Sequence, residues 1–182
     1  MESIEMSDYG KVIGEGTVRF ERLLPGPIER VWEYLTDSDK RALWLAAGEM
    51  RPEEGGPFTL VFRHSELSSK AAPIPDKYKG MEGGASVRGT VTRWEPPHSL
   101  VFTWDEATGR DSEVTIELQA EGESVRLELT HRRLSTRAVM VDVASGWHTH
   151  LGVLVARLEN REPEPFWPAH LEAEEAYGGM IP

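Results

Sequence analysis

Apolar residues near the C-terminal end of the chain recur with the period of an α-helix. On a wheel of about 100° per residue, residues 139–161 place their large apolar side chains on one broad arc, so the pattern predicts a long amphipathic helix. His150 lies inside this arc and His148 lies at its edge. The arc contains Met140, Val143, Ala144, Trp147, Leu151, Leu154, Val155 and Leu158, and the opposite side contains Asp142, Thr149 and Val153.

Strict alternation of apolar and polar residues predicts a series of β-strands before this helix. They cover residues 16–24, 58–64, 87–94, 100–104, 114–118 and 125–129, with a hairpin turn at 121–123. One face of each strand is apolar and the other polar, which is typical of an antiparallel sheet with one covered face. The alternation in 87–94 puts Arg93 on the face of Val91, where it would pair with a buried acid or ligand carboxylate; the alternative is a solvated surface arginine.

Two short helices are predicted after the first strand. Residues 25–27, Pro-Gly-Pro, end that strand, and Pro27 suits the first turn of a helix that contains Val31, Trp32 and Leu35 at helical spacing. Thr36 or Asp37 can cap a second helix over residues 38–45. This layout suggests a helical plug at one end of the sheet.

Two segments interrupt or follow this core. Residues 65–85 contain three Gly and two Pro and are expected to form a long loop, either a lid over a pocket or a tolerated surface insertion. Prolines at 163, 165 and 168 end the long helix, so the remainder is predicted to be an acidic tail that Phe166, Trp167 and Leu171 anchor to the body or to a second subunit. We therefore divide the chain into a polar leader (1–13), a folded domain (14–162) and a proline-rich tail (163–182).

Composition narrows the range of partners. The chain has 182 residues with 20 Lys and Arg against 31 Asp and Glu, and a net charge of −11 disfavours nucleic acid and anionic membranes as partners. It contains no cysteine, which excludes disulfides, thiol catalysis and cysteine-ligated metals. No apolar run approaches the roughly 20 residues of a membrane span, and the N-terminus lacks the features of a secretory signal. A cytoplasmic location is expected.

Five motifs occur in order along residues 16–160. They are PIERVW with LTD at 27–37, GGPF at 55–58, GxVxxWEPPxxLxFTW at 89–104, LxLTH at 127–131, and GW with two leucines at 146–154. With these motifs the chain resembles the START-like, or SRPBCC, superfamily. Within it, the chain is most similar to the branch named after the activator of the 90-kDa heat-shock protein's ATPase.

The resemblance implies an α+β helix-grip fold, in which a curved antiparallel β-sheet wraps around a long C-terminal helix. It also implies a cavity between sheet and helix that holds an apolar or amphipathic small molecule. Relatives include lipid carriers, aromatic-polyketide cyclases, hormone receptors and the chaperone activator itself, so the fold leaves the function open.

Aromatic side chains on the inward faces would line such a cavity. The candidate ligand-binding residues are Trp44, Phe62, Trp104, Trp147, His150 and Leu151. The alternative is that they are core residues only. His148 and His150 point roughly 200° apart on a helix and cannot readily hold one metal ion. No metal, cofactor or catalytic residue is expected.

We expect a protein that carries, senses or sequesters a small hydrophobic or amphipathic molecule. A cyclase- or hydrolase-like enzyme with His150 as acid or base is an alternative that a depressed or raised His150 pKa, or a Glu carboxylate inside the cavity, would favour. A co-chaperone-like interaction module with a chaperone partner is another, which a large exposed apolar patch would favour. Homodimerisation through the sheet edge or residues 166–171 stays open.

Overall fold

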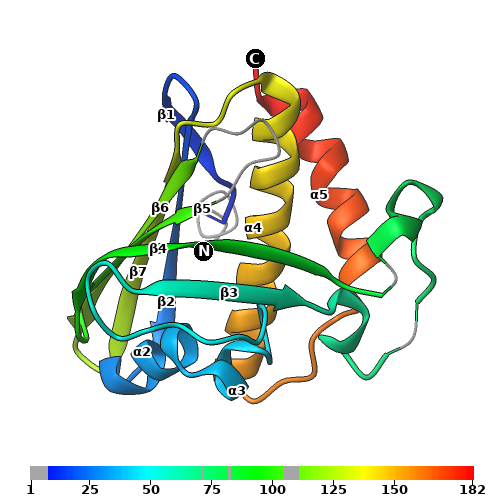
Figure 1. Ribbon diagram of the computed structural model, residues 1–182. Helices are drawn as coiled ribbons and strands as arrows, with labels where there is room; N and C mark the ends of the chain where they lie inside the picture. Colours follow the sequence, from blue (N-terminus) through cyan, green and yellow to red (C-terminus); the bar gives the residue numbers. More distant parts are fainter. Residues whose placement is uncertain (1–7, 71, 82, 105–110) are drawn as a thin grey trace.

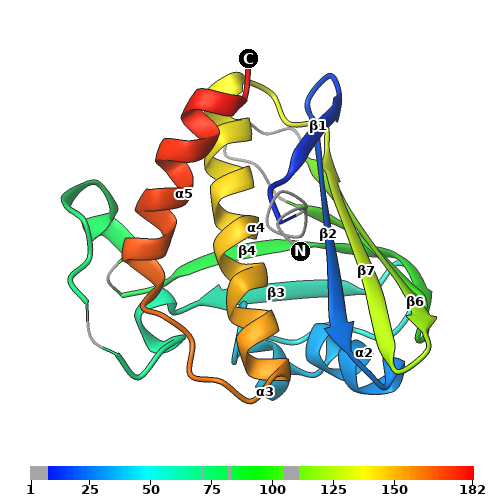
Figure 2. The same cartoon turned by 180° about the vertical axis from the view of Figure 1, so that it is seen from behind.

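A curved antiparallel sheet wraps around one long helix in the computed structural model of the protein (Figures 1 and 2). The structure describes residues 8–70, 72–81, 83–104 and 111–182. Its seven strands follow the order β1-β2-β7-β6-β5-β4-β3, each antiparallel to its neighbours. The arrangement confirms the predicted α+β helix-grip fold. The strands are β1 (Lys11–Gly14), β2 (Thr17–Pro25), β3 (Pro57–Phe62), β4 (Ala85–Glu95), β5 (Ser99–Trp104), β6 (Ser112–Glu121) and β7 (Ser124–Arg132).

The helices lie on the concave side of the sheet and at one of its ends. Two short helices follow β2, as the sequence predicts, and lie together at one end of the sheet (Figure 1). Two longer helices lie side by side on the concave side (Figures 1 and 2). The helices are α2 (Ile28–Thr36), α3 (Ser38–Arg41), α4 (Arg137–Leu158) and α5 (Phe166–Met180), with two 3₁₀ turns, η1 (His64–Glu66) and η2 (Asp76–Met81).

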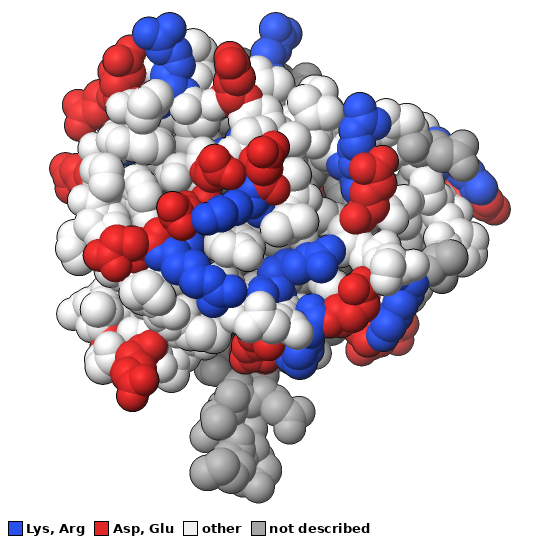
Figure 3. All heavy atoms as spheres, turned by 90° about the horizontal axis from the view of Figure 1, so that it is seen from below, with Lys and Arg blue, Asp and Glu red and all other residues white. Residues whose placement is uncertain are grey.

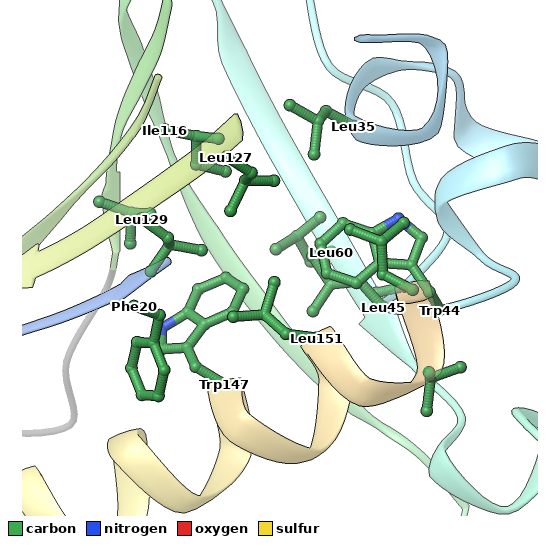
Figure 4. Packing of buried hydrophobic residues seen from close by; sticks show 14 of the residues in the cluster. Phe20, Leu35, Trp44, Leu45, Leu60, Ile116, Leu127, Leu129, Trp147 and Leu151 are labelled. Carbon is green, nitrogen blue, oxygen red and sulfur yellow. The ribbon is translucent and has the colours of Figure 1, made fainter. Parts of the chain in front are cut away.

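The core lies between the sheet and α4. In the β6–β7 hairpin, Ile116 pairs with Leu129, and alternate residues of both strands turn inward. Figure 4 shows these side chains converging on Trp147 and Leu151 of α4. The apolar face of the strands, which repeats every two residues, therefore packs against the apolar face of α4, which repeats every 3.6 residues.

Strand β4 departs from the predicted alternation. Its register against β5 shifts between Val91 and Arg93, so the residues after the shift change faces. Trp94 turns inward and packs edge-on against Trp32 at 5.3 Å between ring centroids. Arg93 is exposed and lies 3.9 Å from the carboxylate of Glu95. The expectation of an inward Arg93 is therefore wrong, and its surface alternative holds.

The second short helix ends earlier than the sequence predicts. The side chain of Arg41, its last residue, binds backbone carbonyls on both sides of it. Asp37 caps α3 by accepting a hydrogen bond from the Lys40 backbone N–H at 3.1 Å. The helix ends at Arg41, and residues 42–45 continue as turns. The Arg41 side chain is 1% exposed, and its guanidinium donates to the carbonyl oxygens of Leu35, Thr36, Ala46 and Gly48. One buried cation thus holds the loop of residues 42–48 against α2.

The C-terminal segment is a helix rather than the expected tail. Pro165 and Pro168 do not prevent it, because the first turn of a helix has no intrahelical partners for its N–H groups. Phe166 and Trp167 are buried, whereas Leu171 is 41% exposed. Phe166 and Trp167 therefore pack inside their own chain. They would not be available to a dimer interface formed by this segment.

Helix α5 runs antiparallel to α4 and covers the face of α4 that the sheet leaves open. Arg137 at the start of α4 donates to the carbonyls of Gly178 and Ile181 at the end of α5, at 2.6 and 3.0 Å. Thr149 and Val153, predicted to face away from the core, are only 5% and 4% exposed. That expectation is wrong because α4 is buried on two sides.

The predicted leader also contributes to the fold. Residues 11–14 form the edge strand β1, and the Tyr9 ring stacks on His148 at 4.8 Å between centroids. The Gly10 N–H donates to the Tyr177 hydroxyl at 2.7 Å, which connects this end of the chain to α5. Residues 1–7 of the expected leader lie outside the described residues.

Replacing Arg41 tests how much the fold depends on the residue 42–48 loop. We expect Arg41→Met to lower the free energy of unfolding by about 2–4 kcal/mol, because several buried carbonyls lose their donor. Lys40→Met is the control: this neighbouring side chain is exposed and pairs only with Glu33 on the surface, so a small effect is expected. Urea denaturation followed by circular dichroism measures both, and equal losses would contradict this role of Arg41.

Candidate functional site

A cavity of about 280 Å³ lies between the sheet, α4, α5 and the η2 turn. Its wall is mainly aromatic and aliphatic, with a few polar groups, which is the usual composition of a small-molecule site. The lining residues are Leu45, Phe62, His64, Tyr78, Met81, Ala85, Val87, Trp104, Val139, Asp142, Val143, Gly146, Trp147, His150, Phe166, Trp167 and His170.

Helix α4 forms one wall with a continuous face. Its lining residues are spaced three and four apart, so their side chains project in the same direction. In the middle of this face stands Gly146, and a Cβ added there would meet no other atom within 4 Å. The missing side chain at Gly146 therefore contributes directly to the open space.

Stacked and tilted rings form the end of the cavity near α5. His64 stacks on Phe62 at 5.4 Å between centroids and lies 4.7 Å from Phe166 and 4.9 Å from Trp167. His150 lies 4.8 Å from Phe166, and Tyr78 stacks on Trp167 at 4.7 Å. Three segments far apart in the sequence thus build one aromatic cluster.

His150 is held in one orientation by the residue 42–48 loop. Its Nδ1 lies 2.8 Å from the Trp44 carbonyl oxygen. Because a carbonyl only accepts, Nδ1 carries the proton and Nε2 of the neutral ring is a hydrogen-bond acceptor. Burial, together with the neighbouring His64, lowers the His150 pKa to about 3. His150 is therefore neutral at physiological pH.

A buried chain of hydrogen bonds fixes the indole of Trp147. Its Nε1 donates to His131 Nδ1 at 3.0 Å, so the proton of the neutral His131 ring is on Nε2 and is donated to Ser112 Oγ at 2.7 Å. Ser112 in turn donates to the Trp104 carbonyl at 3.3 Å. Burial lowers the pKa of His131 to about 3. This chain orients the Trp147 indole and connects it to the backbone of β5 at Trp104.

Three buried nitrogen atoms on residues that line the cavity have no hydrogen-bond partner among the described residues. They are Nδ1 of His64, Nδ1 of His170 and Nε1 of Trp167. Buried polar atoms are rarely left without partners, because each costs about 1–3 kcal/mol. All three residues line the cavity, so a molecule in it could pair with them.

Described residues of the predicted 65–85 loop, Tyr78, Met81 and Ala85, form part of the cavity wall. Tyr78 and Met81 line the cavity, and the Tyr78 hydroxyl lies 3.1 Å from His170 Nε2. The segment is tied to the start of the C-terminal region: Ser68 Oγ donates to the Pro163 carbonyl at 2.6 Å, and Lys70 Nζ lies 2.8 Å from the Glu164 carboxylate. The part of the predicted loop that carries Tyr78 therefore contributes to the site.

Of the residues that the sequence singled out, Phe62, Trp104, Trp147 and His150 line the cavity. Trp44 and Leu151 lie in the core beside it, because their side chains point into the seam between loop, sheet and α4 (Figure 4). Trp44 still acts on the site through its carbonyl oxygen. Sequence reasoning missed the lining residues His64, Tyr78, Gly146 and His170, and for Phe166 and Trp167 it indicated only that they are anchors.

A second hollow of about 450 Å³ lies between α4, α5 and the connection between them. Small residues such as Gly152, Ala156 and Ala169 line it, together with prolines and charged side chains. None of the buried atoms found without partners in the described part of the chain belongs to its lining. The aromatic cavity is therefore the stronger candidate for a ligand site.

Metal clusters and membrane-spanning helices are not found among the described residues. Within residues 8–70, 72–81, 83–104 and 111–182, no three His, Asp or Glu side chains are grouped so that they could hold a metal ion. Among the helices formed by these residues, none combines the length and apolar character needed to cross a membrane. The surface at the α2–α3 end carries basic and acidic side chains side by side (Figure 3).

Several solved structures are similar to this chain. A Bordetella parapertussis protein solved by solution NMR is 46% identical, with a TM-score of 0.81, and the match covers 95% of this chain and 90% of that chain. The crystal structure of CalU16 from Micromonospora echinospora shares the fold at 23% identity and a TM-score of 0.66, covering 94% of each chain. DynU16, a protein in the dynemicin biosynthetic locus, also shares it at 20% identity and a TM-score of 0.64, covering 82% of this chain and 49% of that one.

A search of curated proteins gave no match. A family model, in contrast, matches most of the folded region. The model described as "Activator of Hsp90 ATPase homolog 1-like protein" matches residues 25–159, which include α2, most of the sheet and α4. The sequence motifs, the helix-grip fold and this match agree, and the chain belongs to the family of Activator of Hsp90 ATPase homolog 1-like proteins.

Proposed function

We propose that the protein binds a small apolar or amphipathic molecule in the cavity between the sheet, α4 and α5. The observation that carries this proposal is an aromatic-walled cavity whose lining residues include buried histidine and tryptophan side chains with nitrogen atoms that have no partner among the described residues. A core that served stability alone would be expected to fill this space and to pair these atoms. The ligand would supply both the missing packing and the missing hydrogen bonds.

The dimensions favour a compact ligand. At about 280 Å³ the cavity is near the lower end of the roughly 300–1,000 Å³ that is typical of small-molecule sites. An engineered cavity of about 150 Å³ is enough for benzene. One or two fused rings therefore match the space and the flat aromatic wall better than a long acyl chain does.

Binding fits the chemistry of the site better than catalysis does. A general acid or base works best with a pKa near the operating pH. Burial instead lowers the pKa of His150 to about 3 and that of His64 to about 4, so both rings stay neutral, and the Trp44 carbonyl holds the proton of His150 on Nδ1. A His150 pKa this low is poorly suited to proton transfer at neutral pH. We therefore infer a carrier, sensor or sequestering role.

The alternative of an interaction module has less support from the surface. The family name refers to a chaperone ATPase, but the large exposed apolar side chains of the described residues are divided among Tyr9 with β1, β2, the residue 42–48 loop and α5. Exposed apolar residues that occur singly are normal on soluble domains. A chaperone partner therefore remains the second candidate function.

Filling the cavity from Gly146 tests the proposal directly. Gly146→Leu should project a side chain into the open space and weaken binding of compact aromatic probes such as indole or naphthol by about tenfold or more. Leucine also has a higher helix propensity than glycine by roughly 0.8 kcal/mol, so the fold should be preserved. Isothermal titration calorimetry measures the affinity, and thermal unfolding checks the fold.

Gly152→Leu is the matched control for this experiment. Gly152 is also on α4, and an added Cβ there also meets nothing within 4 Å, but it faces the second hollow. This variant should bind the probes like the unchanged protein. Loss of binding in Gly152→Leu with full binding in Gly146→Leu would overturn the assignment of the site.

Acid should destabilise the protein between about pH 6.5 and pH 3. The ordinary histidine pKa is 6.5, but burial holds the pKa of His64 and His148 at about 4 and that of His131 and His150 at about 3. The unfolded chain therefore binds protons first, so the free energy of unfolding falls as the pH drops through this window and is fully retained above it. Urea denaturation at several pH values measures the slope.

His64→Phe is the companion variant. Phenylalanine keeps the ring contact with Phe62 and removes a nitrogen that has no partner among the described residues. We expect the slope of stability against pH to become shallower by up to about 1.4 kcal/mol per pH unit, since one buried proton acceptor is lost. Parallel curves for the two proteins would show that His64 is not held neutral by the fold.

A further inference from the structure

We propose that the cavity selects a compact ring compound that carries a hydrogen-bond donor and no negative charge, such as a phenol or a ring-bearing amine. This inference rests on the proposed binding function and specifies its ligand class. It is drawn from three features of the lining: the sign of its charges, the direction of its hydrogen-bonding groups and its aromatic faces.

The charges at the cavity are unfavourable for an anion. No Lys or Arg is among the residues found to line it, and Asp142, exposed at the rim, is the one Asp or Glu among them. The positive charge of Lys77 acts on Asp142 and favours its ionised form. The Lys77 Nζ lies 2.8 Å from the Glu174 carboxylate. This basic group is therefore already paired with an acidic side chain.

The histidines do not change this balance. His64 and His150 are neutral because burial lowers each pKa to about 4 and about 3, and burial also lowers the pKa of His170. A ligand carboxylate would lose its hydration on entry and meet no cation among the lining residues. A free fatty acid or an aromatic acid is therefore disfavoured.

The hydrogen-bonding groups favour a donor on the ligand. With Nδ1 of His150 committed to the Trp44 carbonyl, Nε2 is an acceptor within the lining. Trp167 Nε1, which has no partner among the described residues, can donate to a hydroxyl oxygen of the same ligand. A phenol hydroxyl, which both donates and accepts, satisfies both kinds of group.

The aromatic side chains of the cavity also favour ligands with a positive charge. Trp104, Trp147 and Trp167 all line the cavity, and the face of an indole ring attracts an ammonium group. Asp142 adds a carboxylate at the rim. A ring-bearing amine would therefore gain from both the aromatic wall and the rim charge.

A series of naphthalene derivatives of nearly equal size tests the inference by isothermal titration calorimetry. The probes are naphthol, naphthylmethylamine, naphthalene and naphthoate. We expect naphthol to bind about fivefold or more tightly than naphthalene, because it adds a hydrogen bond to a buried neutral acceptor. We expect naphthoate to bind at least about tenfold more weakly than naphthol, because its charge is desolvated without a partner.

Asp142→Asn tests the contribution of the rim charge. It should weaken binding of naphthylmethylamine by about threefold or more and strengthen binding of naphthoate, with naphthol nearly unchanged. Asp39→Asn is the control, since it makes the same change in net charge at an exposed residue of α3 that does not line the cavity. An equal effect of both variants would show that the preference comes from overall charge instead of from the site.

The outcomes distinguish this inference from the proposed function. Binding in the expected order, with a shift in Asp142→Asn only, supports both. Naphthoate that binds as tightly as naphthol, in a way that Gly146→Leu abolishes, overturns the ligand class and leaves the binding function in place. Failure of all four probes to bind overturns the binding function for compact rings, and the inference with it.

Discussion

The burial of α4 on two sides is the constraint on which the rest of the structure depends. Trp147 and Leu151 pack against the sheet, while Thr149 and Val153 are covered by α5. A helix that is apolar over so much of its surface must be covered by more than one layer. Because α5 supplies the second layer, its first turn brings Phe166 and Trp167 to the open end of the sheet and completes the cavity wall there.

Buried hydrogen bonds then convert this packing into a defined site. Arg41 holds the residue 42–48 loop, the loop presents the Trp44 carbonyl, and that carbonyl sets the tautomer of His150. On the sheet side, His131 connects Ser112 to Trp147. Both series of hydrogen bonds end at residues of the cavity wall. The same hydrogen bonds that stabilise the fold therefore also orient His150 and Trp147 in the site.

Burial of the histidines gives the site its chemical character. A histidine in water changes charge near neutral pH, whereas these rings are kept neutral by an aromatic environment that disfavours the charged form. They therefore act as fixed acceptors and donors instead of proton shuttles. Asp142 remains the charged group of the lining, and it lies at the rim where water can still reach it.

The sequence by itself determined the helix-grip fold through its ordered motifs, and its periodicity placed four lining residues, Phe62, Trp104, Trp147 and His150, on buried faces. It did not determine which buried faces meet. The β4 register shift that exposes Arg93, the helix formed despite Pro168, and the meeting of His64, His150 and His170 depend on contacts between segments far apart in the chain. Only the tertiary structure decides those contacts, since they follow from how strands pair and how α5 packs against α4 and not from any local pattern.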